Sequence, residues 1–143
     1  MNSLQLPLRT FDGFRWEIFV EYVAKKMSLT NTIKKRAVKI FSGEKLIVLR
    51  LSNEDMFLMK GMTERDRDLE DMALIARSGI DYNLILNECV EQSEKDIRGN
   101  IWESSLYEKC VELRGKYGID VPIRNKLRKI SEDKLINARK RTL

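Results

Sequence analysis

Carboxylates are the side chains in this sequence whose types and spacing best suit chemistry. The stretch KGMTERDRDLEDM, residues 60–72, packs eight charged side chains into thirteen positions. Within it, Glu64, Asp68 and Asp71 follow one another at i, i+4 and i+7, which places them along one face of a helix. Such a row of acids either belongs to a metal or nucleotide site, or stabilises the start of a helix and forms ion pairs with neighbouring lysine and arginine side chains. The second, structural interpretation is sufficient to explain the spacing.

Several other chemistries are excluded by what the sequence lacks. It contains no histidine, so neither a Ser–His nor a Cys–His pair can form a catalytic base and nucleophile. The phosphate-binding patterns GxGxxG and GxxxxGK[ST] are also missing. Cys89 and Cys110 are isolated, without CxxC spacing, and their positions in helical patterns predict buried free thiols.

A second acidic candidate is Glu17, which lies in the alternating stretch FRWEIFVEYV, residues 14–23. Alternation of aromatic and β-branched residues predicts a strand. An acid on an edge strand usually faces water. A carboxylate on a rigid strand beside an acidic helix would also suit Mg²⁺, which takes one or two carboxylates together with phosphate oxygens and water. Both interpretations stay open.

Length, composition and charge set the broad class. With 143 residues, of which 43% are hydrophobic and 34% charged, we expect one globular domain over residues 1–143. No membrane-spanning apolar run and no signal-peptide pattern occur, which predicts a cytoplasmic protein without membrane contact. Residues 51–123 hold sixteen acidic and nine basic side chains, whereas the segments on either side are basic. These basic segments either face the acidic middle, within one molecule or between subunits, or bind phosphate.

The elements that must position these residues divide the chain into two parts. Residues 14–51 predict a small sheet of about three strands with a short basic helix at 29–36 and a hairpin that turns at 42–45. Residues 52–143 predict a helical part. The fold class that follows is α+β, with the sheet on the N-terminal side and the helices after it.

The helix boundaries follow from capping residues and glycines. Five signals mark them: a Ser52–Asp55 capping box, a Thr63 cap for a helix that ends before Gly79, a start at Asp81, a start at Asn100 with an end at Gly118, and a last segment from Pro122 that we interpret as two helices separated near Ser131.

The last segment is a candidate for binding nucleic acid, because its cations can contact phosphates. It lacks an aromatic side chain for stacking on bases, and its apolar residues follow an ordinary amphipathic pattern, so a solvated face or docking on the acidic middle is the structural alternative. The candidate residues are Arg124, Lys126, Arg128, Lys129, Arg139, Lys140 and Arg141.

A resemblance adds roles to some of these residues. The strand RWEIFV at 15–20 and the later stretch from Ser52 to Gln92, which also includes Glu88, are similar to the C-terminal part of an archaeal branch of minimal nucleotidyltransferases. That branch belongs to the polymerase-β-like superfamily, together with abortive-infection nucleotidyltransferase toxins. The match covers about 80 of the 143 residues. It implies catalytic roles for Glu17, Lys60 and Asp68, metal binding by Glu17, nucleotide binding by Lys60 and Arg65, and Mg²⁺ as the cofactor.

The sequence also departs from that family. The family's Gly-Ser turn and Asp-x-Asp metal pair do not occur before Glu17, and glutamate replaces the usual aspartate there. Two-metal catalysis needs closely placed ligands, so we expect that the chain alone is not a competent nucleotidyltransferase. The function we expect is a self-associating or partner-binding module. Half of a split Mg²⁺-dependent nucleotidyltransferase, and nucleic-acid binding through the C-terminal helix, are the alternatives.

Overall fold

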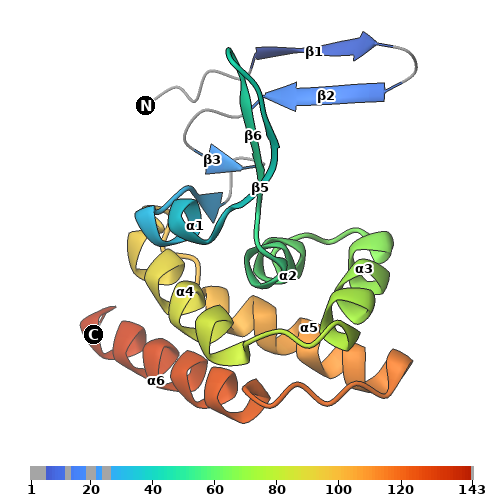
Figure 1. Cartoon of the computed structure of the whole chain (residues 1–143). Coiled ribbons are helices and arrows are strands. Elements are labelled where there is room, and N and C mark those ends of the chain that lie inside the picture. The colour runs from blue at the N-terminus through green and yellow to red at the C-terminus, as the bar shows by residue number, and fades with distance from the viewer. Residues whose placement is uncertain (1–5, 12–13, 19–21, 24–26, 143) are drawn as a thin grey trace.

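Strands precede a mostly helical C-terminal part, which confirms the predicted α+β class (Figure 1). The computed structural model describes residues 6–11, 14–18, 22–23 and 27–142, and the side chains of Tyr22 and of residues 27–141. None of the helices in these residues combines the length and the apolar character that crossing a membrane requires.

The strands pair antiparallel as three two-stranded sheets, β1 with β2, β3 with β4 and β5 with β6. The predicted hairpin is confirmed, and the strand predicted over 14–23 is confirmed for Phe14–Ile18, whereas Tyr22–Val23 belongs to a separate strand pair. β1 and β4 lack the alternation that would have identified them. The strands span Leu6–Phe11 (β1), Phe14–Ile18 (β2), Tyr22–Val23 (β3), Met27–Ser28 (β4), Val38–Ser42 (β5) and Ile47–Arg50 (β6).

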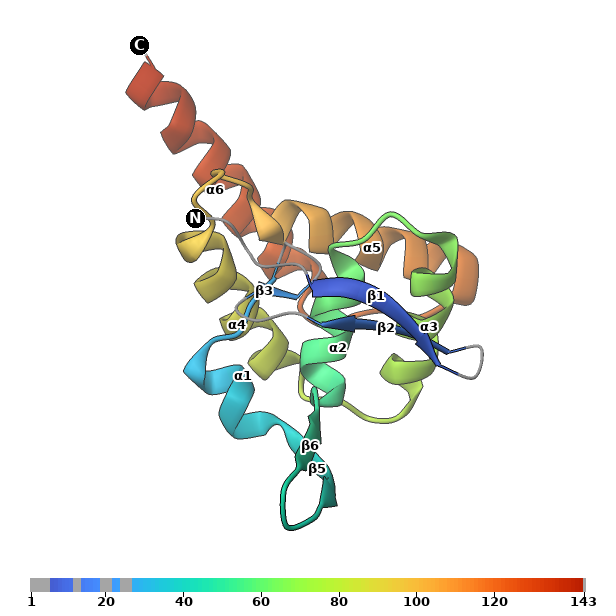
Figure 2. The ribbon, with the colours of Figure 1, turned by 90° about the horizontal axis from the view of Figure 1, so that it is seen from above.

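The helices surround α2, which contacts α3, α4 and α5, while α6 packs along α5 (Figure 1). Seen from above, the C-terminal end of α6 and the β5–β6 hairpin project from opposite sides of the helical body (Figure 2). The helices span Asn31–Arg36 (α1), Asn53–Gly61 (α2), Asp66–Arg77 (α3), Tyr82–Lys95 (α4), Trp102–Tyr117 (α5) and Arg124–Thr142 (α6).

Local capping explains most of the helix boundaries. The Ser52 hydroxyl accepts a hydrogen bond from the backbone N–H of Asp55 at the start of α2, as the capping box predicts. Asp81 caps α4 through the N–H groups of Asn83 and Leu84. Gly118 ends α5 with a φ of +67°, a left-handed conformation that side chains rarely adopt.

Three predicted helix boundaries were wrong, and in each case the polar side chain is hydrogen-bonded to a group other than the one that the prediction requires. Thr63 does not cap α3, which begins at Asp66; its hydroxyl contacts the Asp68 carboxylate instead. Asn100 does not cap α5, because its amide donates to Asp96. Ser131 does not divide the last segment, because its hydroxyl donates to the carbonyl of Arg128 and leaves α6 continuous.

The core lies mainly between the helices and includes one apolar side of α3. Leu69, Met72 and Ala73 are buried there. Cys89 and Cys110 are buried free thiols, as predicted. Burial raises the pKa of both, to about 12 for Cys110, so neither is a reactive thiolate near neutral pH.

At Gly61, the last residue of α2, the helix packs closely against α5. A Cβ at this position would lie 2.7 Å from Cδ1 of the fully buried Leu106. We predict that Gly61→Ala lowers the free energy of unfolding by about 1–2 kcal/mol, because Leu106 must move in a packed core. Urea denaturation measures this change. In the matched control Gly115→Ala, on α5, the new Cβ meets nothing within 4 Å, and helix propensity should stabilise by about 0.5–1 kcal/mol. Equal stability of the two variants would contradict the close approach.

Candidate functional site

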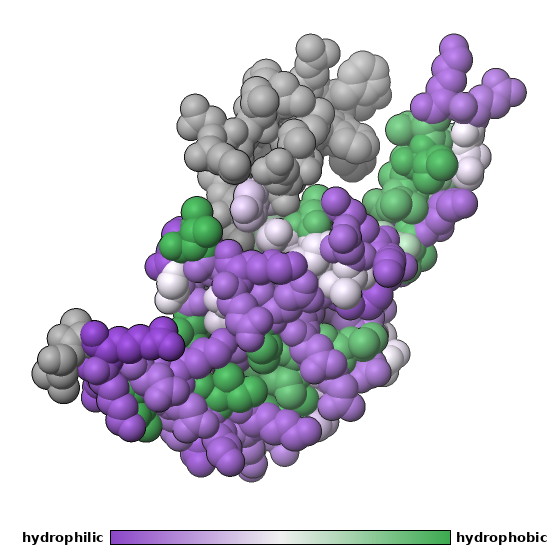
Figure 3. Space-filling model, turned by 90° about the vertical axis from the view of Figure 1, so that its left-hand side faces the viewer, coloured by the Kyte–Doolittle hydropathy of each residue, from purple (hydrophilic) through white to green (hydrophobic). Residues whose placement is uncertain are grey.

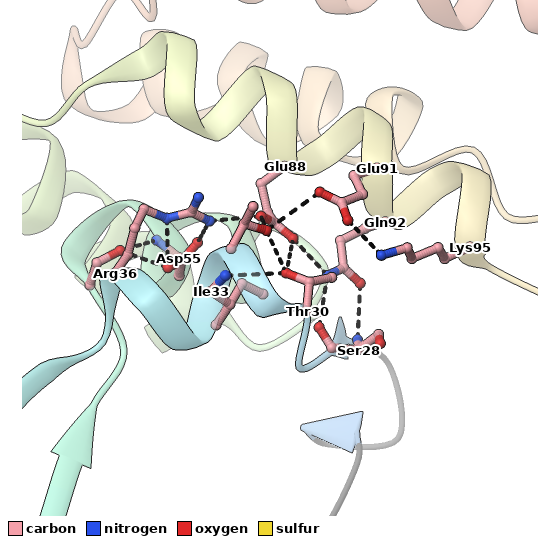
Figure 4. Close-up of polar contacts among 11 residues, drawn as sticks. Ser28, Thr30, Ile33, Arg36, Asp55, Glu88, Glu91, Gln92 and Lys95 are labelled. Atoms are coloured by element: carbon pink, nitrogen blue, oxygen red, sulfur yellow. Dashed lines mark hydrogen bonds and ion pairs between the residues drawn. The ribbon is translucent and has the colours of Figure 1, made fainter.

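Among the described residues, two networks of three charged side chains connect helices, and the larger one joins α1, α2 and α4 (Figure 4). We call it the Arg36 cluster. Its members are Thr30, Thr32, Arg36, Asp55, Glu88 and Gln92.

Arg36, the last residue of α1, binds two buried carboxylates at once. Its guanidinium donates to both oxygens of Asp55, from Nε at 3.2 Å and from Nη2 at 2.6 Å. The same Nη2 donates to Oε2 of Glu88 at 2.7 Å. Asp55 and Glu88 are only 1% and 2% exposed. Such carboxylates need several donors to stay ionised, and the geometry supplies them.

Every oxygen of Glu88 has hydrogen-bond donors. Thr30 and Gln92 donate to Oε1, while Thr32 and Arg36 donate to Oε2. Burial by itself would raise the pKa of Glu88, but these hydrogen bonds, led by the one from Arg36, outweigh burial and hold the pKa below its ordinary value. Glu88 is therefore an ionised structural anchor, unsuited to proton transfer near neutral pH.

The Gln92 amide extends the cluster to β4. Its Oε1 accepts from the N–H of Ser28 at 2.9 Å, and its Nε2 donates to the Ser28 carbonyl at 2.8 Å. The side chain thus pairs with the backbone much as a neighbouring strand would. The cluster holds the end of the strand region against α4.

The second cluster is formed by residues of the charged stretch 60–72. Lys60 of α2 donates to Oδ1 of Asp68 at 3.1 Å and to Oδ2 of Asp71 at 2.6 Å, both on α3. The Thr63 hydroxyl donates to the second oxygen of Asp68. We call Lys60, Thr63, Asp68 and Asp71 the Lys60 cluster. The structure therefore brings the predicted residues Lys60 and Asp68 together.

Each charge in the cluster has an opposite partner, although one ammonium against two carboxylates leaves one net negative charge. Burial would lower the pKa of Lys60, but the hydrogen bonds to Asp71 and Asp68 outweigh it and raise the pKa. Burial would likewise raise the pKa of Asp68, but Thr63 and Lys60 hold it below its ordinary value. Arg65 precedes α3 and is exposed; its backbone carbonyl accepts a hydrogen bond from the Asp68 N–H, and its charge helps to lower the pKa of the Asp68 carboxyl. The cluster joins α2 to α3 as an ion-pair network.

The metal-binding part of the predicted site cannot be assembled from the described residues. Glu17 lies in β2, but its side chain is outside the described set. Among the residues that are described, no group of three or more acidic, cysteine or histidine side chains is arranged to hold a metal ion. Asp68 and Asp71 are both bonded to Lys60 instead.

The predicted nucleic-acid residues all lie on α6 but face different surroundings. Arg124 and Arg128 line a groove between α5 and α6. Lys126 and Lys129 are exposed on α6 outside that groove. Arg139, Lys140 and Arg141 are exposed at its C-terminal end.

Sequence reasoning did not single out Arg36, Thr30, Thr32 or the groove-lining Arg114. The one signal available for the Arg36 cluster was the pair Glu88 and Gln92, one turn apart on a helix. Asp55 was identified as a capping residue, which it is, but its second role with Arg36 depends on a residue 19 positions away. No local pattern indicates such a partner.

Comparison with known proteins assigns no family to this arrangement. No family model matches the chain, and no curated protein and no solved structure matches it either.

Removing Arg36 tests the first cluster. We predict that Arg36→Met lowers the free energy of unfolding by about 3 kcal/mol at neutral pH, because two buried carboxylates lose their cation. The control Lys35→Met removes an exposed cation from the same helix and should change stability by less than about 0.5 kcal/mol. Denaturant titrations of both variants measure the difference.

The same variant carries a pH signature. The pKa of Glu88 is lowered in the folded protein, so its stabilising effect is present above the ordinary value of 4.5 and is lost as pH falls through the lower folded value. The stability difference between the parent and Arg36→Met should therefore narrow below about pH 4.5. A stability difference between the two proteins that stays constant well below pH 4.5 would contradict an ionised Glu88.

Lys60 provides a separate test of the second cluster. We predict that Lys60→Met costs about 1–2 kcal/mol, since Asp68 is largely buried beside it. Lys109 is about equally exposed but pairs with the exposed Glu112, so Lys109→Met should cost less than about 0.5 kcal/mol. If thermal or urea unfolding shows equal losses, the Lys60 cluster does not stabilise the junction of α2 and α3.

Proposed function

We propose that this chain is a self-associating module and that the β5–β6 hairpin is the surface through which two copies bind. One observation carries the proposal: the hairpin projects from the body with apolar side chains uncovered (Figure 3). Large hydrophobic side chains on a soluble protein are normally scattered, whereas a contiguous exposed group marks a contact surface. Those exposed between 40% and 60% are Val38, Ile40, Phe41, Leu46, Ile47 and Leu49.

Both faces of the hairpin are apolar. The register pairs Phe41 with Val48 on one face, and Lys39 with Leu49 and Ser42 with Ile47 on the other. A hairpin whose one face rested on the body would alternate between buried and exposed residues, but β5 is exposed throughout. Neither face is therefore covered by the described part of the chain.

The edges of the hairpin are open as well. Within the described residues, no third strand pairs with β5 or β6. An isolated two-stranded hairpin is marginally stable in water, and open edges favour pairing with another strand. Association supplies both the missing hydrogen bonds and the apolar contact.

The Arg36 cluster fixes the base of the hairpin. Arg36 lies two residues before β5, and Asp55 follows β6 by five residues, so their ion pair closes the segment that contains both strands. The hairpin is thereby held in a projecting position rather than folded onto the helices. A preformed strand pair loses less conformational entropy on binding than a flexible loop does.

A second copy of this chain fits the hairpin's charge pattern. Residues 46–49 carry no charge. Two-fold antiparallel pairing of β6 with the β6 of another copy, centred on Val48, places Ile47 opposite Leu49 and keeps the two Arg50 side chains apart. The pairing is self-complementary, as a symmetric dimer requires.

The split-nucleotidyltransferase alternative has less support in the geometry. A nucleotide at Lys60 and Arg65 would require Lys60 to give up two carboxylate partners. Mg²⁺ would compete with the same ammonium for Asp68. Self-association requires no such rearrangement.

Light scattering after size exclusion, over a range of concentrations, tests the proposal. We expect a dimer for the parent chain and a monomer for Ile47→Lys/Leu49→Lys, because two lysines on one face of the hairpin disfavour its burial. Thermal unfolding of the variant checks that the helical body stays intact.

The matched control is Leu74→Lys, which replaces an equally exposed leucine on α3 and should leave the dimer unchanged. A parent chain that stays monomeric at every concentration would refute self-association. If Leu74→Lys abolishes the dimer to the same extent, the hairpin is not the specific interface.

A further inference from the structure

The groove between α5 and α6 is lined by three arginines. Arg114 comes from α5, and Arg124 and Arg128 come from α6. The groove has a volume of about 600 Å³. It lies in the helical body away from the β5–β6 hairpin, so what it binds is independent of the proposed function.

The arginines are available to an anionic ligand. Among the described residues, the Arg114 side chain has no hydrogen-bond or ion-pair partner. Arg124 pairs at 3.3 Å with Asp120, and Arg128 at 3.7 Å with Glu132, and these acids are 67% and 61% exposed. Exposed pairs of this kind contribute little stability, so a phosphate can replace the carboxylates at low cost.

The groove also contains an aromatic ring, which the basic C-terminal segment itself lacks. Tyr107 of α5 is half-buried and lines the groove. Asn125 of α6 adds an amide that can donate and accept hydrogen bonds. At Gly115 nothing stands within 4 Å of where a Cβ would be, so a ligand can approach the backbone of α5 there. Cations, a ring and an amide therefore face one space.

We propose that this groove binds single-stranded nucleic acid. Arg114, Arg124 and Arg128 contact the phosphates, and Tyr107 packs against a base. This combination of phosphate contacts and aromatic stacking is typical of single-strand recognition without sequence preference. A duplex fits less well, because its bases are already stacked and cannot cover the recessed ring.

Fluorescence anisotropy with a labelled thymidine oligonucleotide at low salt tests the proposal. We expect Arg114→Ala and Arg128→Ala each to raise Kd about 5–10-fold, as the loss of one charge-assisted phosphate contact predicts. Tyr107→Leu keeps an apolar side chain but removes the ring, and should raise Kd at least about 5-fold. Circular dichroism confirms that each variant is folded.

The control is Lys140→Ala, which removes the same charge from the exposed end of α6 outside the groove and should change Kd less than about 2-fold. An equal effect of Lys140→Ala and Arg114→Ala would show that net charge alone attracts the oligonucleotide, and would overturn the site. Undetectable binding at low salt, equal affinity for duplex DNA, or full competition by millimolar inorganic phosphate would also overturn it.

The same titration in the Ile47→Lys/Leu49→Lys background separates this inference from self-association. Because the two new lysines can themselves attract phosphate, binding by the monomer supports the groove only where Arg114→Ala in this background still weakens it about 5–10-fold. Binding that disappears together with the dimer would place the nucleic-acid contact at the hairpin and overturn the assignment to α5 and α6.

Discussion

The carboxylates of Asp55 and Glu88 are buried, and a cation with several donors compensates their loss of water. Arg36 meets this requirement because its planar guanidinium binds one carboxylate through two nitrogens and the second through one of them. Since the three residues belong to α1, α2 and α4, the ion pairs set the relative positions of these helices. They also close the base of the β5–β6 hairpin.

The Lys60 cluster performs a similar task one step further along the chain. The turn between α2 and α3 contains backbone hydrogen bonds of its own, and Lys60 adds a connection between the two helices through Asp68 and Asp71. Of the eight charged residues in the stretch 60–72, Lys60, Asp68 and Asp71 pair with one another, and the other five side chains are exposed. Asp68 and Asp71 are hydrogen-bonded to Lys60, so they offer less to a metal ion than free carboxylates would.

Two other surfaces carry groups that have no partner among the described residues. The hairpin leaves apolar side chains and strand edges open, and the α5–α6 groove leaves an arginine without a partner among the described residues. The two surfaces lie on different parts of the body (Figures 1 and 2). A dimer formed through the hairpins would leave a groove accessible on each copy. The uneven charge of the chain follows its elements, because the acidic segment 51–123 includes α2 to α5 and the basic segment 124–143 contains α6.

The sequence by itself determined the α+β class, the hairpin and most helix boundaries, because these depend on local periodicity and capping. Ser52, Asp81 and Gly118 act where the pattern predicts. It singled out Lys60 and Asp68 only through the resemblance, and their pairing depends on the tertiary structure. The tertiary structure alone decided the Arg36 cluster, whose members lie 19 and 52 residues from Arg36. It likewise decided the uncovered hairpin and the joining of Arg114 and Tyr107 to α6. Burial and long-range contact depend on how helices pack, and a local pattern does not encode them.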